Sequence, residues 1–136
     1  MSAHNRRLKT ITFTLGATEF QCQVSTWNLA NNSDDGEQMF TFCPDGEFRE
    51  ESDDNYALEL TFFSDWRSAG ISTYLWENDR ADVAFQLDHH PDIALEHVRW
   101  SGTCRIKAPN VGGDVRTTEV TEATMQCIGL PVFSRP

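Results

Sequence analysis

The stretch from Thr73 to His90, TYLWENDRADVAFQLDHH, changes its hydrophobic period partway along. Up to Trp76 the apolar residues follow a helical spacing, whereas from Val83 onward apolar and polar residues alternate. A helical period that passes into a period of two predicts a helix followed directly by a half-buried strand. The sequence therefore predicts a fold that places one helix inside a run of strands.

Alternating segments dominate the rest of the chain, and turn signals such as Pro44-Asp45-Gly46 separate them. Residues 10–15 and 19–29 alternate on either side of a short turn, which predicts a β-hairpin. Gly102 lies inside an alternating segment and indicates a bulge or a close approach of two backbones. The other expected strands are 38–43, 56–63, 81–89, 97–107 and 115–130, and we expect Pro131 to end the last one.

The helix is expected over Asp65–Asn78, with Ser64 as its N-cap and Ile71 one turn before Leu75. About seven strands and one helix predict a mainly β fold, a β-sandwich or barrel with one flanking α-helix. The length of 136 residues fits a single domain over 1–136, preceded by an N-terminal arm over 1–9.

Most of the excess negative charge falls in one region. Between Asp34 and Asp54 the chain has nine acidic residues and one basic residue, Arg49, a net charge of −8. Like charges at this density repel one another and are costly to bury. Residues 44–55, PDGEFREESDDN, therefore predict a long acidic loop between strands that is either a solvated flexible loop or a contact with a partner.

The composition excludes several classes of protein. A formal net charge of −10 argues against a protein that grips nucleic-acid phosphates or an anionic membrane surface. The chain has no apolar run of membrane-spanning length, and its first ten residues lack the apolar stretch of a signal peptide, so we expect synthesis in the cytosol. The four cysteines form no Cys-x-x-Cys pair, and each is expected to be a small buried apolar residue: Cys22, Cys43, Cys104 and Cys127.

The sequence shows no recognisable catalytic signature, so we predict no catalytic residue, no cofactor and no enzymatic activity. Asp88-His89-His90-Pro91-Asp92 is the best candidate for a metal site. Neighbouring histidines on a strand point to opposite faces, so one ion takes both only where the strand ends. We therefore predict no metal site and leave open a metal near His89 and His90.

The order of elements, rather than any single motif, carries a resemblance to a known family. A hairpin comes first, an acidic excursion separates two strands, and a helix and three strands follow. This order, the stretches ALELTFFSDW (57–66) and GISTYLWEN (70–78), the connection IKAPNVGGD (106–114) and the final TEVTEATMQCIGLP (118–131) resemble the tail tube, or major tail, proteins of long-tailed bacteriophages. The resemblance extends from Ile11 to Pro131.

The resemblance implies a β-sandwich flanked by one helix, with six copies in a ring and rings stacked into the tail tube of a virion. It implies assembly in the cytoplasm of a host bacterium, contacts with tape measure, terminator and distal tail proteins, passage of DNA through the lumen without specific binding, and no membrane contact. The helix over 65–78 is then expected near a subunit boundary. The inter-ring loop of the family corresponds here to Asp45, Glu47, Phe48, Arg49, Glu50, Glu51, Asp53 and Asp54.

Charge adds two expectations to the resemblance. An acidic bore would repel DNA phosphates and let the genome slide. An acidic loop that reaches a neighbouring ring is expected to meet a basic counter-patch, for which the candidates are Arg99, Arg105, Lys107 and Arg116.

Two other classes remain open at the level of sequence. One is a head–tail connector or tail terminator, which forms a single ring and does not polymerise. The other is a carbohydrate- or protein-binding β-sandwich module, which would use Trp27 or Trp66 as an exposed aromatic platform.

Overall fold

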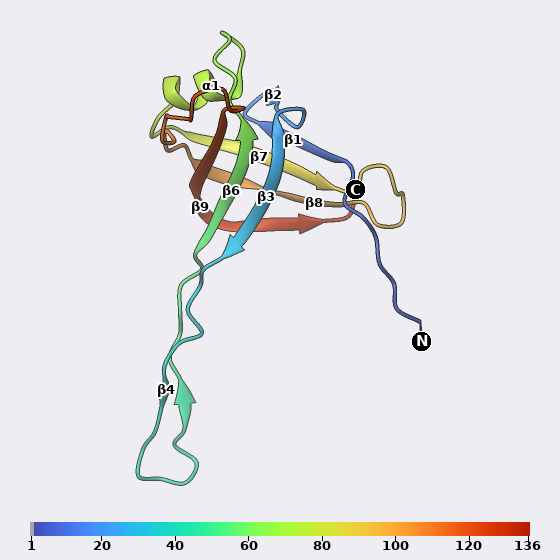
Figure 1. Cartoon of the computed structure of the whole chain (residues 1–136). Coiled ribbons are helices and arrows are strands. Elements are labelled where there is room, and N and C mark those ends of the chain that lie inside the picture. The colour runs from blue at the N-terminus through green and yellow to red at the C-terminus, as the bar shows by residue number, and fades with distance from the viewer. Residues whose placement is uncertain (1) are drawn as a thin grey trace.

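The computed structural model describes residues 2–136, and within that range it is mainly β with one α-helix, as predicted (Figure 1). Residues 2–10 form neither helix nor strand, and Arg6 pairs with Glu96 at 3.0 Å. The elements are β1 (Ile11–Leu15), β2 (Thr18–Glu19), β3 (Val24–Asn31), β4 (Gln38–Met39), β5 (Phe48–Arg49), β6 (Tyr56–Phe63), α1 (Ile71–Glu77), β7 (Asp82–His89), β8 (Val98–Arg105) and β9 (Val120–Ser134).

Seven strands form one antiparallel sheet in the order β2-β1-β7-β8-β9-β6-β3. The sheet curves into a half-barrel because β9 belongs to both of its halves (Figure 1). Residues 120–126 of β9 pair with β6, and residues 127–134 pair with β8. Gly129, at φ +78°, supplies left-handed backbone, a conformation that favours glycine, where the pairing of β9 with β8 is irregular between Ile128 and Val132.

Pro131 does not end the last strand, contrary to the prediction. The register between β8 and β9 shifts between Ser101 and Thr103, so Pro131 lies at an irregularity of the ladder, where its missing N–H is tolerated. Gly102 lies opposite this irregularity. A Cβ at Gly102 would lie 3.2 Å from Cε1 of Phe85 and 3.5 Å from Cα of Pro131, so the predicted close approach is confirmed.

The helix is shorter than predicted. It begins after Gly70, which is the N-cap residue and provides no side-chain cap, and Ser64 lies well before the helix. The side chain of Asp65 instead accepts hydrogen bonds from the backbone and guanidinium of Arg67, and this interaction holds a loop before the helix. Gly70 lies so close to this loop that an added Cβ would be 2.3 Å from the carbonyl oxygen of Asp65.

The core fills the concave side of the half-barrel beneath α1. The expected alternation is confirmed in β1 and β7, whose buried apolar side chains lie two residues apart and belong to the same core cluster as the helix residue Leu75. The largest fully buried side chains are Phe13, Phe62, Leu15, Leu58, Ile71, Leu75, Leu87, Ile106 and Met125.

Two strand predictions are wrong in part or in full. The predicted hairpin of residues 10–15 with 19–29 is only partly right: β1 pairs with β2 at Thr18–Glu19, but the chain turns again over residues 21–23 and β3 pairs with β6. Residues 38–43 do not form a sheet strand, because only Gln38–Met39 is extended and it pairs with β5 outside the main sheet.

The cysteine prediction is half right. Cys104 is buried and Cys127 is partly buried, but Cys22 and Cys43 are exposed. Cys22 lies in the turn before β3, and Cys43 lies at the far end of the β4–β5 segment, where no core is present to cover it.

Candidate functional site

Residues 32–55 leave the domain as a long projection, which we call the hairpin arm (Figure 1). The hairpin arm continues the β3–β6 pair in the same register. Asn31 faces Tyr56 at its base, the backbone N–H of Asn32 donates to the carbonyl of Asn55 at 2.7 Å, and Met39 faces Phe48 further out. The β3–β6 pair and the hairpin arm are therefore one continuous hairpin. Its outer half, the hairpin arm, pairs with no further described strand of the main sheet.

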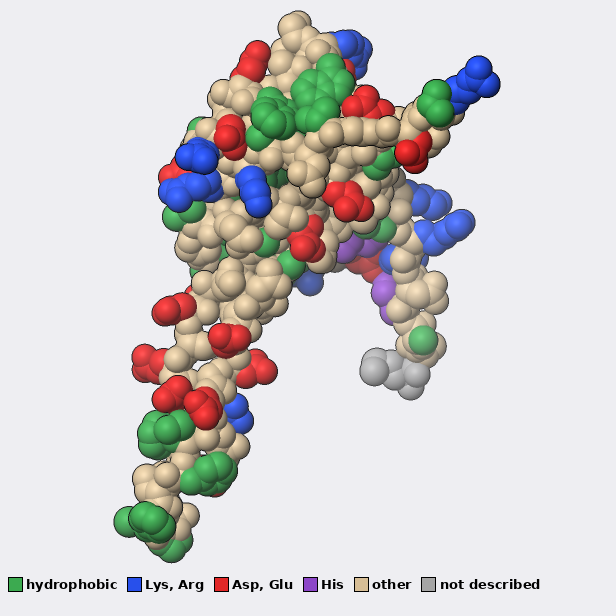
Figure 2. Space-filling model, turned by 60° about the vertical axis from the view of Figure 1, so that its left-hand side comes forward, with side chains coloured by type: hydrophobic (Ala, Val, Ile, Leu, Met, Phe, Trp, Pro, Cys, Tyr) green, Lys and Arg blue, Asp and Glu red, His purple; other side chains and the backbone are tan. Residues whose placement is uncertain are grey.

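The stem of the hairpin arm is acidic on both strands (Figure 2). Every acidic residue between Asp34 and Asp54 is exposed. The structure thus brings together the predicted inter-ring residues: Asp45 and Glu47 near the turn, Phe48 and Arg49 in β5, and Glu50, Glu51, Asp53 and Asp54 on the returning strand. The projection begins twelve residues before the predicted loop over 44–55, because the outgoing strand leaves the sheet as well.

The tip of the hairpin arm is apolar, and the sequence prediction missed this feature. Phe40 is 72% exposed, Phe42 is fully exposed and Phe48 is 55% exposed. The run QMFTFC (38–43) was expected to be half buried in a sheet. The signal that identifies it as exposed is its position, because polar and acidic segments flank it on both sides and leave no neighbouring strand to cover it.

The hairpin arm is weakly held by its own contacts. Its two strand segments contain two residues each, and the guanidinium of Arg49 donates to the carbonyl of Gly36 at 2.9 Å. At the tip, the N–H of Gly46 donates to the carbonyl of Cys43 at 3.0 Å and closes the turn. An isolated two-stranded hairpin is marginally stable in water. Exposed aromatic side chains on such an element indicate a surface that another molecule covers.

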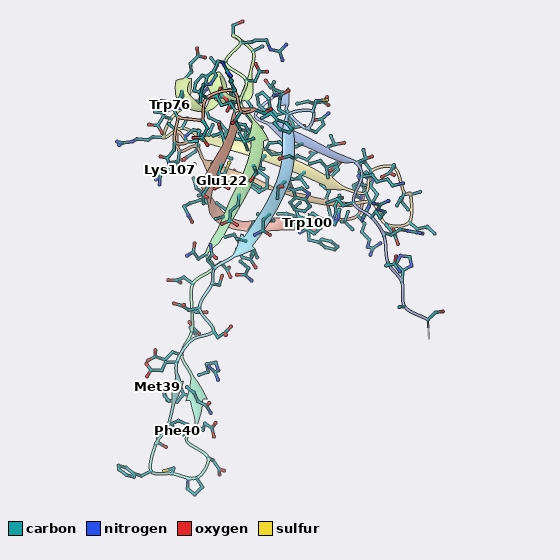
Figure 3. All side chains as sticks on the ribbon, in the orientation of Figure 1. Met39, Phe40, Trp76, Trp100, Lys107 and Glu122 are labelled. Atoms are coloured by element: carbon teal, nitrogen blue, oxygen red, sulfur yellow. The ribbon has the colours of Figure 1, made fainter. Side chains whose placement is uncertain are left out.

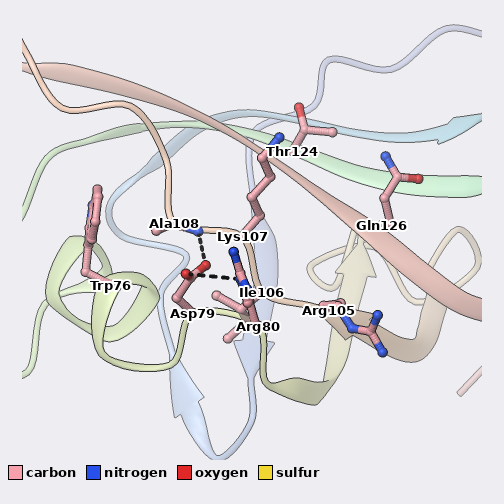
Figure 4. A pocket seen from close by; sticks show the side chains of 9 residues that line it. All are labelled: Trp76, Asp79, Arg80, Arg105, Ile106, Lys107, Ala108, Thr124 and Gln126. Atoms are coloured by element: carbon pink, nitrogen blue, oxygen red, sulfur yellow. Dashed lines mark hydrogen bonds and ion pairs between the residues drawn. The ribbon is translucent and has the colours of Figure 1, made fainter.

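A second surface lies on the domain itself, where α1 approaches β9 (Figure 4). We call it the α1–β9 groove, and its volume is about 550 Å³. Trp76, 47% exposed, stands at one side, and buried Ile106 forms part of the floor. The Asp79 carboxylate accepts a hydrogen bond from the N–H of Ala108 at 2.8 Å and fixes the segment after β8 against the helix end. Its residues are Trp76, Asp79, Arg80, Arg105, Ile106, Lys107, Ala108, Thr124 and Gln126.

Three basic side chains surround the α1–β9 groove: Arg80, Arg105 and Lys107. Arg105 Nε lies 2.9 Å from Asp82 Oδ1, and this hydrogen bond raises the pKa of Arg105. Lys107 is exposed and forms no ion pair with the part of the chain that the structure describes. The flank of the domain shows gathered basic side chains in Figure 2, in contrast to the acidic hairpin arm.

The predicted basic counter-patch is only partly brought together. Arg105 and Lys107 lie in the α1–β9 groove, and Arg80, which the sequence prediction missed, joins them from the turn after α1. Arg99 lies six residues before Arg105 along β8, roughly 20 Å away. Arg116 lies in the loop before β9, outside the groove.

Arg99 has a different role, because it is the partner of a buried carboxylate. Arg99 Nε lies 2.7 Å from Asp88 Oδ1, and Asp88 is 5% exposed. The hydrogen bond from Arg99 lowers the pKa of Asp88, and His97 adds to this effect. The pair joins β7 to β8 at the end of the half-barrel opposite α1.

His89 and His90 are packed against each other and against an aromatic side chain. His89 ends β7, and His90 has a left-handed φ of 52°, so the two rings stack with centroids 4.3 Å apart. Trp27 packs edge-on against His89, and burial lowers the pKa of His89. Trp27 is thus part of the aromatic packing, whereas Trp66 is 45% exposed and its indole N–H donates to Glu119. Within residues 2–136, no cluster of three or more His, Cys, Asp or Glu side chains is arranged to hold a metal ion.

No protein-family model matches the chain, and no curated protein matches its sequence. Among residues 2–136, no helix has both the length and the apolar character needed to cross a membrane.

Proposed function

We propose that the chain is a structural subunit that assembles with copies of itself into rings, and that these rings stack as the tail tube of a long-tailed bacteriophage. The observation that carries the proposal is the hairpin arm. Its aromatic tip lies far from the core of its own domain, and its register with β3 and β6 fixes its direction (Figure 1). A weakly held projection with an apolar tip gains stability when a neighbouring subunit covers it.

The edges of the sheet support lateral association. Within the described chain β3 pairs only with β6, and at the other end of the sheet β2 provides only two residues to cover β1. Unpaired edges are a liability in a monomer, and closure of a ring of identical subunits removes them. Six copies in a ring is the number that the resemblance to tail tube proteins implies.

The charge supports a conduit for DNA. A net charge of −10 per chain gives a ring a strongly negative field, which repels phosphates and lets the genome pass without being bound. The proposed partners are therefore other copies of the chain, together with the tape measure, terminator and distal tail proteins of a tail. The proposed location is the virion tail, after assembly in the host cytoplasm.

Electron microscopy of the purified chain tests the proposal, and the hairpin provides a matched variant. Asn32 and Asn55 are directly paired, so replacing residues 33–54 with Asn-Gly closes the same hairpin with a two-residue turn and keeps the β3–β6 register. We expect hollow tubes from the intact chain and no tubes from the armless variant, which stays folded.

Three results contradict this proposal or a part of it. A strictly monomeric intact chain at all concentrations refutes self-assembly. Single rings that never stack, with or without the hairpin arm, identify a connector or terminator ring rather than a tube subunit. Tubes from the armless variant refute the role of the hairpin arm and leave ring formation through the sheet edges in place.

A further inference from the structure

We propose that the α1–β9 groove is the receptor for the aromatic tip of the hairpin arm of another copy of this chain. This inference rests on the proposed self-assembly and adds the acceptor surface to it. The hairpin arm shows which side chains are donated, and the groove provides a surface of the required size, polarity and charge on the same molecule.

The two surfaces lie at opposite ends of the molecule (Figure 3). Met39 and Phe40 lie near the far end of the hairpin arm, whereas Trp76 and Lys107 lie at the α1 end of the domain (Figure 3). At about 3.3 Å per residue, the run from Asn32 to the turn at Cys43 spans roughly 35 Å away from the domain. The hairpin arm therefore points away from the groove of its own domain, and a contact between them joins two copies head to tail.

A head-to-tail contact has a specific consequence for assembly. Each copy donates one hairpin arm and offers one groove. A stack of copies therefore always keeps a free hairpin arm at one end and a free groove at the other, where a further copy can bind. Heterologous contacts of this kind produce open stacks unless a rotation closes them. This geometry matches the stacking of one layer of subunits on the next.

The apolar parts of the two surfaces are complementary. Phe40 and Phe42 lie just beyond the end of β4, and both side chains are exposed at the tip of the hairpin arm. The groove exposes the indole of Trp76 beside Ile106, which gives aromatic side chains an apolar wall. Its volume of about 550 Å³ is in the range of sites that enclose apolar groups.

The charges of the two surfaces are also complementary. The tip carries Asp45 and Glu47 beside its aromatic residues, and the stem behind it is acidic throughout. The groove carries Arg80, Arg105 and Lys107. Arg105 is paired with Asp82, and Arg80 lies 4.0 Å from Asp79, so Lys107 is the basic side chain of the groove that has no ion pair within the described chain. Contact between an acidic arm and this flank offsets the repulsion that otherwise opposes the stacking of chains with a charge of −10.

Disulfide trapping tests the contact directly, because the tip already contains an exposed thiol. In a Cys22→Ser background, Cys43 is the remaining exposed cysteine of the described chain. Thr124→Cys places a partner thiol in the groove, and Thr10→Cys places one on an exposed site at the opposite end of the domain as the control. We expect mild oxidation to give a ladder of linked oligomers with Thr124→Cys and none with Thr10→Cys.

Charge reversal tests how much Lys107 contributes to the contact between the hairpin arm and the groove. The chain has only two lysines, so Lys9, which lies outside the groove, provides the matched control. We expect Lys107→Glu to raise the concentration needed for assembly about tenfold and a second change, Glu47→Lys, to restore it. Lys9→Glu makes the same change in net charge outside the groove and is expected to have a much smaller effect.

The outcomes separate this inference from the proposed function. Normal tubes with no Thr124→Cys ladder and no effect of Lys107→Glu overturn the groove as receptor while self-assembly stands. A chain that stays monomeric in light scattering and gives no ladder overturns both. A ladder with Thr10→Cys equal to that with Thr124→Cys shows non-specific collision and overturns the groove as well.

Discussion

Phe42→Ala gives the sharpest separation between folding and assembly. Phe42 is fully exposed in the isolated subunit, so its truncation removes no packing from the folded domain. We therefore expect the free energy of unfolding to change by no more than about 0.5 kcal/mol. The same side chain is expected to be buried when the hairpin arm docks, and burying a phenylalanine side chain contributes about 1.5–3 kcal/mol.

The magnitude follows from the part of the side chain that alanine lacks. A loss of about 2 kcal/mol per docked hairpin arm weakens each contact roughly thirtyfold, because 1.4 kcal/mol corresponds to a factor of ten. The concentration at which stacks appear is expected to rise by a similar factor. Sedimentation velocity over a concentration series measures that rise, and thermal denaturation of the dilute subunit measures stability.

Leu95→Ala is the matched control, because Leu95 is 89% exposed and lies in the loop between β7 and β8, outside both proposed surfaces. It is expected to change neither assembly nor stability. Two results for Phe42→Ala refute the reasoning: an unchanged assembly concentration, which shows that the tip is not buried, or a melting temperature lowered by several degrees, which shows that Phe42 supports the fold.

Three further predictions concern the domain itself. Gly129→Ala forces a Cβ onto a residue at φ +78° and is expected to destabilise the chain by about 1–2 kcal/mol in urea unfolding; an unchanged midpoint would show that the left-handed backbone in β9 does not need glycine. Asp88→Asn removes the charge paired with Arg99 and is expected to cost about 1–3 kcal/mol at pH 7. Because the folded pKa of Asp88 is lowered, its contribution is present above the unfolded value near 3.8 and is lost as pH falls through the folded pKa, so a variant as acid-sensitive as the parent would contradict the assignment. Burial raises the pKa of Cys104 to about 12, so at pH 8 a thiol reagent is expected to label Cys43 rapidly in the dilute subunit and Cys104 only after unfolding; mass spectrometry measures both, and fast labelling of Cys104 in the folded chain would refute its burial.

The sequence predicted the class of the fold because hydrophobic period is a local property. The change of period after Trp76 is visible in the residues themselves, and the strand that follows, β7, agrees with the prediction to within one residue at its start. The end of β9 was not predictable in this way. Pro131 normally ends a strand, and its tolerance depends on the register with Gly102, which belongs to a different strand.

Pairing was harder to predict than the strands themselves. Residues 24–31 form a strand as expected, with an irregularity between Val24 and Thr26, but nothing local shows that they pair with β6 rather than with the preceding β1. The same limit applies to the hairpin arm. Its acidic part was visible as a run of charge, whereas the exposure of Phe40 and Phe42 depends on the absence of neighbouring strands beside the arm, which is a property of the assembled sheet.

The basic side chains illustrate the limit at a candidate site. Arg105 and Lys107 are close in sequence and remain close in space, but Arg80 reaches the same groove from the turn after α1. Arg99 has the right charge and lies on the same strand as Arg105, yet its partner is Asp88 on β7. The number of charged side chains can be counted from a sequence. The ion-pair partner of each one depends on which strands lie side by side in the sheet.

The unbroken register from β3 and β6 into the hairpin arm makes the arm's length adjustable without disturbing the domain. One residue added to each strand lengthens the arm by about 3.4 Å and turns the aromatic tip to the opposite face, and two residues added to each strand restore the face at about 7 Å. The repeat distance of a stack built through this arm is therefore expected to change in discrete steps, set by insertions or deletions in matched pairs.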